Sequence, residues 1–302
     1  MGRMPDPATR PFWIALVPAV FVLLWALSFQ FTVIAIRDIE PFTMLAIRSA
    51  LNIVIALPVV LAVGARWPRS WREAAHIAIA GILLQTVYLA SVINAMFHGM
   101  PQGTAALIAG LQPLITALAA GPLLGERLGR RQWLGIAFGL AGVALVVGDR
   151  VSGNASTLAF LLIAPAPFLI TAASLYQKRF CAGMDMWSGL VIQHGAAGIT
   201  QLALALALED MVVRWSWPML AAIVYMSLFI SIGANNLYFF MLKRGAATKA
   251  ASLFYLTPGL TAVLAWIGFG EALTVTAIAG FAAATLGVAL VTRAGTSRDA
   301  AA

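Results

Sequence analysis

One stretch of this chain occurs twice, at a constant offset of 145 residues and without a gap. The shared positions are Leu111, Pro113, Thr116, Gly125, Glu126 and Leu128 in the first copy, and Leu256, Pro258, Thr261, Gly270, Glu271 and Leu273 in the second. Similar apolar composition produces some chance matches, but proline, glycine and glutamate paired at one fixed offset are not explained that way. The chain is therefore a duplicated unit, and we divide it into residues 1–148 and 149–302.

A surplus of apolar residues decides what the duplicated unit folds into. Of the 302 residues, 62% are hydrophobic and 10% are charged, whereas a soluble domain is about a quarter charged. A membrane helix needs roughly 20 apolar residues. The sequence predicts an all-α integral membrane protein with ten transmembrane helices, of which the fifth and tenth look short. The predicted helices are 13–36, 41–64, 74–97, 104–124, 133–148, 157–177, 186–208, 219–242, 249–268 and 275–292.

Lysine and arginine are distributed unevenly between the two predicted membrane faces. Both termini and the loops after the second, fourth, sixth and eighth helices hold fifteen of them, whereas the other loops hold only Arg37, Arg150 and Arg214. Cytoplasmic segments are enriched in these residues, so both termini are predicted to face the cytoplasm. This topology explains the net charge of +8 without nucleic acid, which we do not expect as a partner.

The odd number of helices in each half determines how the halves are related. A unit of five helices crosses the membrane five times, so its second copy enters from the opposite side. The sequence therefore predicts two inverted five-helix repeats, related by a pseudo-twofold axis in the membrane plane. Many secondary transporters are built in this way, and their substrate sites lie near the midplane between the repeats.

Two prolines of the duplicated stretch, Pro113 and Pro258, fall near the centres of predicted helices. A proline there removes a backbone hydrogen bond, which membrane proteins tolerate where a neighbour or a cavity satisfies the freed carbonyl. We expect both prolines and their neighbours Gln112 and Thr257 to line a central cavity, and a static packing kink is the alternative. The paired glutamates end on opposite faces and are expected to be structural, each near a helix N-terminus.

Polar side chains form a stripe on each of the repeat-related helices 74–97 and 219–242. The stripes consist of Gln85, Tyr88, Ser91, Asn94 and His98 on the first helix and of Ser227, Ser231, Asn235 and Tyr238 on the second. Such stripes face the bundle interior or water, so they are expected to line the translocation path, with interhelical hydrogen bonding as the alternative. Arg48, His194 and Lys249 are candidates for charge or proton coupling, unless Arg48 extends to the outer face and His194 only packs.

These residues match a known family. The chain resembles the drug/metabolite transporter superfamily, in its ten-helix EamA-type branch. The features that carry the resemblance are the tandem halves, the central prolines followed by 125–128 and 270–273, the glycine-rich segments 135–146 and 280–291, the region 25–29 with Ala26 in place of the usual glycine, and Arg48. The resemblance implies a multi-pass transporter of the cell inner membrane that moves small molecules.

Within this branch, the chain is similar to the YddG-type aromatic amino acid exporters. That similarity implies that aromatic residues stack on the substrate side chain and that Asn235, Gln112 or Lys249 meets the amino-acid head group, although an aromatic stripe is also what core packing produces. The expected substrate-binding residues are Trp25, Ser28, Phe29, Gln85, Tyr88, Gln112, Pro113, Asn235, Tyr238, Phe254, Thr257 and Pro258.

The sequence contains no ATP-binding motif, no metal-ligand spacing and no nucleophile–base pairing. We therefore expect a gradient-driven exporter of small amphipathic metabolites, chiefly amino acids, with no cofactor or metal and no enzymatic activity. Its partners are the small-molecule substrate and the lipid bilayer. Proton antiport and facilitation by the substrate gradient both stay open, as does the oligomeric state, with which a monomer is compatible. The alternative substrates are drugs, nucleotide sugars and threonine-like amino acids, and the alternative classes are a lipid-modifying enzyme and a receptor or assembly subunit.

Overall fold

Apolar helices make up nearly all of the computed structural model, which describes residues 12–124, 129–152, 156–234, 237, 241 and 256–299. In chain order the helices are α1 (Phe12–Ile36), α2 (Pro41–Val63), α3 (Trp71–Gly81), η2 (Ile82–Tyr88), α4 (Leu89–Phe97), α5 (Gln102–Ala109), α6 (Gln112–Leu124), α7 (Arg130–Ser152), α8 (Thr157–Ile163), α9 (Ala166–Phe180), α10 (Met186–Leu208), α11 (Trp217–Tyr225), η3 (Met226–Ala234), α14 (Thr257–Phe269) and α15 (Val275–Asp299). Within these ranges, nine helical stretches are long and apolar enough to cross a membrane, and Thr257–Phe269 is a shorter apolar helix.

The predicted helices agree with the observed ones except at their ends and at two breaks, which divide 104–124 between α5 and α6 and 157–177 between α8 and α9. The two helices expected to be short are α7 and α15, and they are 23 and 25 residues long. The expectation was wrong because hydropathy marks only the apolar middle of a helix, whereas both helices continue through polar residues at their ends. The predicted helices 219–242 and 249–268 extend in part beyond the residues that the structure describes.

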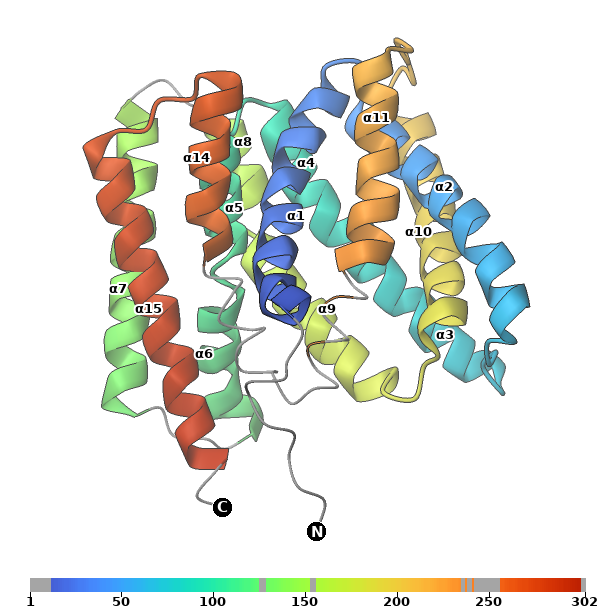
Figure 1. Ribbon diagram of the computed structural model, residues 1–302, viewed down its shortest axis with the longest axis horizontal. Coiled ribbons are helices and arrows are strands. Elements are labelled where there is room, and N and C mark those ends of the chain that lie inside the picture. The colour runs from blue at the N-terminus through green and yellow to red at the C-terminus, as the bar shows by residue number, and fades with distance from the viewer. Residues whose placement is uncertain are drawn as a thin grey trace.

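Close contacts between small residues of α7 and α15 reveal the symmetry of the fold, and these helices lie side by side in Figure 1. A Cβ atom added at Gly142 would lie 2.5 Å from the carbonyl oxygen of Gly280, and one added at Gly135 would lie 2.6 Å from that of Gly287. The offset of 145 residues converts each pair into the other, as a twofold axis requires. The start of α1 and the end of α15 also lie at the same end of the molecule (Figure 1). The two repeats are therefore inverted.

The third and eighth spans each contain a π-helical segment. These segments are η2, over Ile82–Tyr88, and η3, over Met226–Ala234. Shifted by 145 residues, the bounds of η2 fall inside those of η3. π-Helical turns are rare in proteins, and those that do occur are often found at functional sites. Their occurrence at matching repeat positions indicates that the widened turn belongs to the repeat unit.

The fourth span is broken between α5 and α6, not kinked at its proline. α5 ends at Ala109, and the carbonyl oxygen of Leu111 accepts hydrogen bonds from the backbone N–H groups of residues 114 and 115. Pro113 is thus the second residue of α6, where a missing N–H leaves no helical acceptor unpaired. Pro258 occupies the second position of α14. This placement corrects the expected mid-helix kinks, and the physical reason is that each proline begins a helix.

Two glutamates stabilise helix N-termini that belong to other parts of the chain. Glu209 accepts hydrogen bonds from the backbone N–H groups of Phe42 (2.6 Å) and Thr43 (2.8 Å) at the start of α2. Glu271 accepts one from the backbone N–H of Gln102 (3.0 Å) at the start of α5. The first N–H groups of a helix lack intrahelical partners and attract negative charge. Glu271 therefore caps a helix of the first repeat, while its repeat mate lies outside the described residues.

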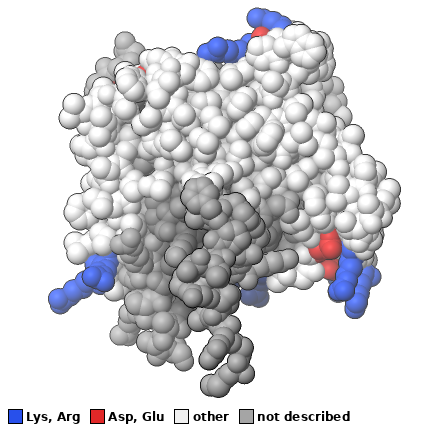
Figure 2. Space-filling model, in the orientation of Figure 1, with Lys and Arg blue, Asp and Glu red and all other residues white. Residues whose placement is uncertain are grey.

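Charged side chains gather at the two ends of the described structure, and a broad uncharged belt separates them (Figure 2). The exposed cations at the end that holds the start of α1 are Arg66, Arg69, Arg72, Arg130, Arg131, Lys178 and Arg179. Those at the opposite end are Arg37 and Arg214. An uncharged belt between charged ends is the surface expected of a protein that spans a bilayer.

Candidate substrate cavity

A cavity of about 390 Å³ lies between the two repeats. Its volume falls in the range of roughly 300–1,000 Å³ that is usual for small-molecule sites. The aromatic side chains of its wall are Trp25, Phe29, Tyr88 and Trp187. The polar side chains are Ser28, Thr32, Arg48, Gln85, Gln177, Gln193, His194 and Ser231. The cavity is therefore amphipathic, and both π-helical segments contribute to its wall.

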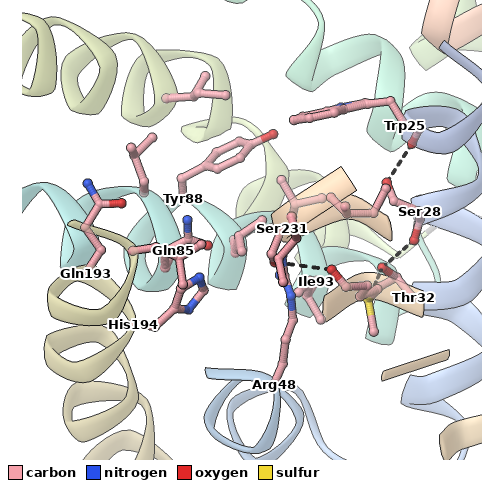
Figure 3. Close-up of a pocket in the computed structure, with 18 of the residues that line it drawn as sticks. Trp25, Ser28, Thr32, Arg48, Gln85, Tyr88, Ile93, Gln193, His194 and Ser231 are labelled. Carbon is pink, nitrogen blue, oxygen red and sulfur yellow. Dashed lines mark hydrogen bonds between the residues drawn. The ribbon is translucent and has the colours of Figure 1, made fainter. Parts of the chain in front are cut away.

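The structure brings together eight of the side chains that the sequence singled out. These are Trp25, Ser28, Phe29, Arg48, Gln85, Tyr88, His194 and Ser231, all of which line the cavity. Figure 3 shows Trp25 and Tyr88 on one side of it and Arg48 on the other. The first span positions its residues through local bonds, because Ser28 Oγ donates to the Trp25 carbonyl (2.6 Å) and Thr32 Oγ1 donates to the Ser28 carbonyl (2.8 Å).

The residues around the two prolines lie elsewhere. Gln112, Pro113, Thr257 and Pro258 are absent from the described lining of the cavity. Gln112 Nε2 instead donates to Ser174 Oγ (3.1 Å), and Pro258 borders a separate void of about 10 Å³. Their predicted substrate contacts stay predictions. Four further expected site residues, Asn235, Tyr238, Phe254 and Lys249, lie outside the described residues.

The polar side chains of the stripe on the third span fall into two groups with different contacts. Gln85 and Tyr88 line the cavity, whereas Ser91 donates to the carbonyl oxygen of Leu162. Asn94 donates to the carbonyl oxygen four residues before it, at 2.9 Å. The lower-numbered part of the stripe thus faces the cavity, and the remainder makes hydrogen bonds to the backbone.

Arg48 enters the cavity from α2 and is only 8% exposed. Its Nη2 donates to Ser231 Oγ (3.2 Å), which also accepts from Asn52 Nδ2 (3.1 Å). The hydroxyl hydrogen of Ser231 is directed to the carbonyl oxygen of Met226 (3.2 Å). The suggested extension of Arg48 towards the outer face is therefore wrong, because these buried groups hold its side chain inside the bundle.

His194 completes the polar network on the neighbouring helix α10. Ser49 Oγ donates to Gln201 Oε1 (2.7 Å) and is left to accept from His194 Nδ1 (3.2 Å). Asn52 Nδ2 lies 3.2 Å from His194 Nε2 and donates to it. A neutral imidazole that carries its proton on Nδ1 satisfies both hydrogen bonds, because Nδ1 then donates and Nε2 accepts. Ser49 and His194 are separated by 145 residues, so this contact lies on the pseudo-twofold axis.

The family model of the EamA-like transporter family matches residues 12–148 and 157–293, one match in each half. The chain belongs to this family. That result confirms the resemblance to the drug/metabolite transporter superfamily. A protein with a known crystal structure also shares the fold, with a TM-score of 0.66 and 21% identity over 94% of this chain and 98% of its own.

Several curated proteins are similar to this EamA-like chain. The inner membrane transporter YedA of Escherichia coli is 28% identical over 83% of this chain and 82% of its own. The probable terminal-alkyne amino-acid exporter of Streptantibioticus cattleyicolor is 28% identical over 76% of each chain. The probable amino-acid metabolite efflux pump of Escherichia coli is 22% identical over 84% and 86%. Our chain is accordingly a multi-pass membrane transporter of the inner membrane.

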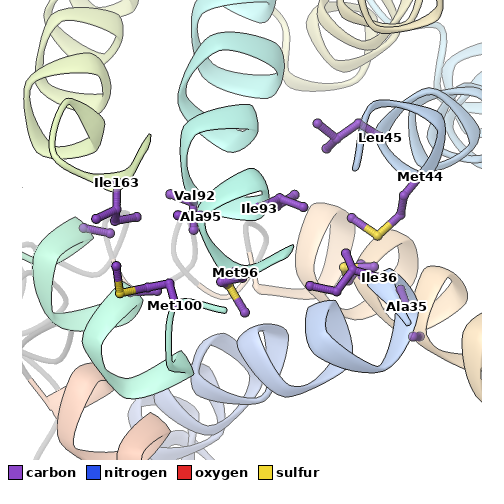
Figure 4. Close-up of a cluster of buried hydrophobic side chains, with 14 of the residues drawn as sticks. Ala35, Ile36, Met44, Leu45, Val92, Ile93, Ala95, Met96, Met100 and Ile163 are labelled. Carbon is purple, nitrogen blue, oxygen red and sulfur yellow. The ribbon is translucent and has the colours of Figure 1, made fainter. Parts of the chain in front are cut away.

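An apolar cluster lies between the cavity of this EamA-like protein and the end that carries Arg37. It joins the ends of α1 and α4 to α5, α8 and the starts of α2 and α11, and Figure 4 shows three of its methionines, Met44, Met96 and Met100. Hydrogen bonds tie the loops above it, because the Asp38 carboxylate accepts from Ser216 Oγ (2.5 Å). The cavity is thus separated from this end by packed side chains.

Sequence reasoning missed much of the polar network in this member of the family. Asn52 and Gln201 are fully buried, and neither was among the expected residues. Asn52 follows Arg48 by one helical turn, so a polar face on α2 was visible in the sequence. Gln201 stands seven residues after His194 on the same face of α10. Polarity at helical spacing was the signal that could have identified both.

Proposed function

We propose that this transporter exports small amphipathic metabolites, chiefly amino acids and among them aromatic ones, by alternating access between its inverted repeats. The observation that supports the proposal is the cavity between the repeats, with Trp25 and Tyr88 opposite Arg48. Aromatic rings provide contact area for an apolar side chain, and the polar side provides hydrogen bonds for a head group. The relatives named for amino-acid export point to the same substrate class.

The orientation of the protein in the membrane follows from the distribution of charge. We place the cation-rich end, which holds the start of α1, in the cytoplasm because cytoplasmic segments are enriched in lysine and arginine. The cavity extends towards that end, since Met184 and Met186 line it between α9 and α10. The methionine-rich cluster and the loops above it form the barrier on the external side. The described conformation then corresponds to one with its external barrier closed.

Facilitation by the substrate gradient is the mechanism that the described residues favour. No aspartate or glutamate is among the described residues that line the cavity. A second proton on His194 would be placed at Nε2, opposite the donor Asn52 Nδ2. Two donors would then face each other, so protonation requires the network to rearrange.

Transport by the purified protein in liposomes tests the proposal. We expect exchange of radiolabelled phenylalanine, tryptophan and tyrosine that does not depend on an imposed pH gradient. Replacing Trp25 by alanine should lower uptake of these substrates roughly 3- to 10-fold, since an aromatic pair contributes about 0.5–1.5 kcal/mol beyond buried area. The matched control is Trp266→Ala in α14, because that side chain is 55% exposed on the outer surface.

The outcomes separate the parts of the proposal. Movement of threonine without any aromatic amino acid would exclude the aromatic part. Dependence on the pH gradient would replace facilitation by proton antiport. If no amino acid, nucleotide sugar or drug in the panel moved, transport of small amphipathic metabolites would be excluded.

A further inference from the structure

The buried guanidinium of Arg48 has hydrogen-bonding capacity that its described neighbours do not use. Nη2 donates to Ser231 Oγ, while Nε is buried and has no hydrogen-bond partner. A guanidinium carries several N–H donors arranged in a rigid planar fork. An unsatisfied buried donor is costly, and one on a charged group is more so. The side chain therefore has donors available for a further acceptor.

No counter-ion accompanies Arg48 in the described part of the chain. The described cavity lining contains no carboxylate, and Glu209 and Glu271 are committed to helix N-termini. The undescribed stretch 242–255 contains no aspartate or glutamate in its sequence. Uncompensated charge within a membrane protein is unfavourable and marks a functional group. The missing negative charge is thus one that a ligand can supply.

The groups around Arg48 are arranged to hold it in place. Ser231 Oγ accepts from both Arg48 and Asn52, and Asn52 also donates to His194. His194 contacts Ser49 across the repeat axis. The network thus ties the guanidinium to α2, α10 and η3 before any ligand arrives. Preorganised donors of this kind bind an acceptor with little loss of conformational entropy.

We infer that Arg48 binds the carboxylate of the substrate, and that the carboxylate, not the ammonium group, is what this cavity recognises. This inference rests on the proposed function and extends it. An arginine fork matches the planar geometry of a carboxylate, to which it can donate two parallel hydrogen bonds. Trp25 and Tyr88, on the other side of the cavity (Figure 3), are placed to contact the remaining apolar part. Aromatic carboxylates without an amino group are then ligands, and aromatic amines without a carboxylate are not.

Competition against labelled phenylalanine in liposomes tests this recognition. The probes are 3-phenylpropionate and N-acetylphenylalanine, which have a carboxylate but no ammonium group, and phenethylamine and phenylalaninamide, which have the reverse. Only the carboxylates should compete with the wild-type protein. Arg48→Gln should weaken their competition about 10- to 100-fold, which corresponds to the loss of a charged hydrogen bond. Arg48→Lys should weaken it less and keep the preference. Arg214→Gln, at an exposed loop position, is the matched control and should change nothing.

Binding to the detergent-purified protein separates this inference from the proposed function. We expect 3-phenylpropionate to raise the unfolding temperature of the wild-type protein but not of Arg48→Gln. If phenylalanine is not transported and this protection is still seen, amino-acid export fails and the carboxylate site stands. Equal competition by amines and carboxylates, or a preference unchanged in Arg48→Gln, would overturn the inference. Equal protection by chloride or inorganic phosphate would overturn it too. If Arg48→Gln does not fold, carboxylate competition in Arg48→Lys that is as strong as in the wild-type protein, or weakened no more than in Arg214→Gln, would overturn it.

Discussion

Replacing Gly142 by alanine is expected to destabilise the protein even though alanine is the better helix former. The added Cβ would lie 2.5 Å from the carbonyl oxygen of Gly280 and 2.6 Å from the backbone nitrogen of Ala284, both in α15. Backbone atoms cannot rotate away, so the two helices must separate. Overpacking of this kind costs about 1–3 kcal/mol, against which helix propensity returns up to about 1 kcal/mol.

Gly148 provides the matched control because it lies in the same helix with nothing within 4 Å of an added Cβ. Gly148→Ala should therefore be stabilised by the higher helix propensity of alanine, with no cost from overpacking. The two variants should differ by about 1–3 kcal/mol, or roughly 5 °C in apparent melting temperature at about 2–4 °C per kcal/mol. The assay is thermal unfolding of detergent-purified protein. A Gly142→Ala protein that melts at or above the temperature of Gly148→Ala would refute the reasoning.

Three further predictions follow from other contacts. Glu209→Gln should lower stability by about 1–2 kcal/mol in the same unfolding assay, because it weakens the bonds to the start of α2. Burial, and secondarily the charge of Glu73, raises the pKa of the Cys181 thiol. Alkylation by N-ethylmaleimide at pH 7 should therefore be slower than for free cysteine, and its rate should still rise above pH 9. Cysteines at Ile39 and Val213, which pair across an antiparallel bridge, should cross-link on oxidation and stop transport until they are reduced.

Each of these predictions has a control and a contrary result. Asp210→Asn, at the exposed position next to Glu209, should leave stability unchanged, and an equal loss there would contradict the capping argument. Glu73→Gln should move the alkylation profile of Cys181 to lower pH. An unchanged profile would show that the charge of Glu73 does not raise the pKa of this thiol. The cross-linking variant is made in a Cys181→Ser background. Full transport by the oxidised protein would show that the loops of the external end need not separate.

The fold was predictable from the sequence because its strongest signals are local. The repeated stretch gives the offset of 145 residues, and the same offset relates the contacts of Gly135 and Gly142 in α15. Helix lengths were harder to predict, since α7 and α15 continue past their apolar middles. Pro113 was misplaced because a proline is compatible with a kink inside a helix and with the first turn of a new one.

The residues of the candidate cavity could be predicted only in part, for a different reason. Trp25, Tyr88 and Arg48 could be chosen from depth and residue type alone, and the structure places all three around one cavity. Periodicity does not say which helices face each other, so the bonds from Asn52 and Gln201 to their partners in other helices could not be derived. Repeat position was also an incomplete guide, because both Gln112 and Thr257 lie away from the described wall.

The contact between Ser49 and His194 joins the same position of two inverted repeats. If the two end states arise when the repeats exchange conformations, that contact maps onto itself and persists in both. The bond between Arg48 and Ser231 instead maps onto Gln193 and Thr86, a different pair. Substitution at Ser49 or His194 should then affect both states equally and alter only the rate of exchange or the overall stability. Substitution at Arg48 should shift the balance between the inward- and outward-facing states.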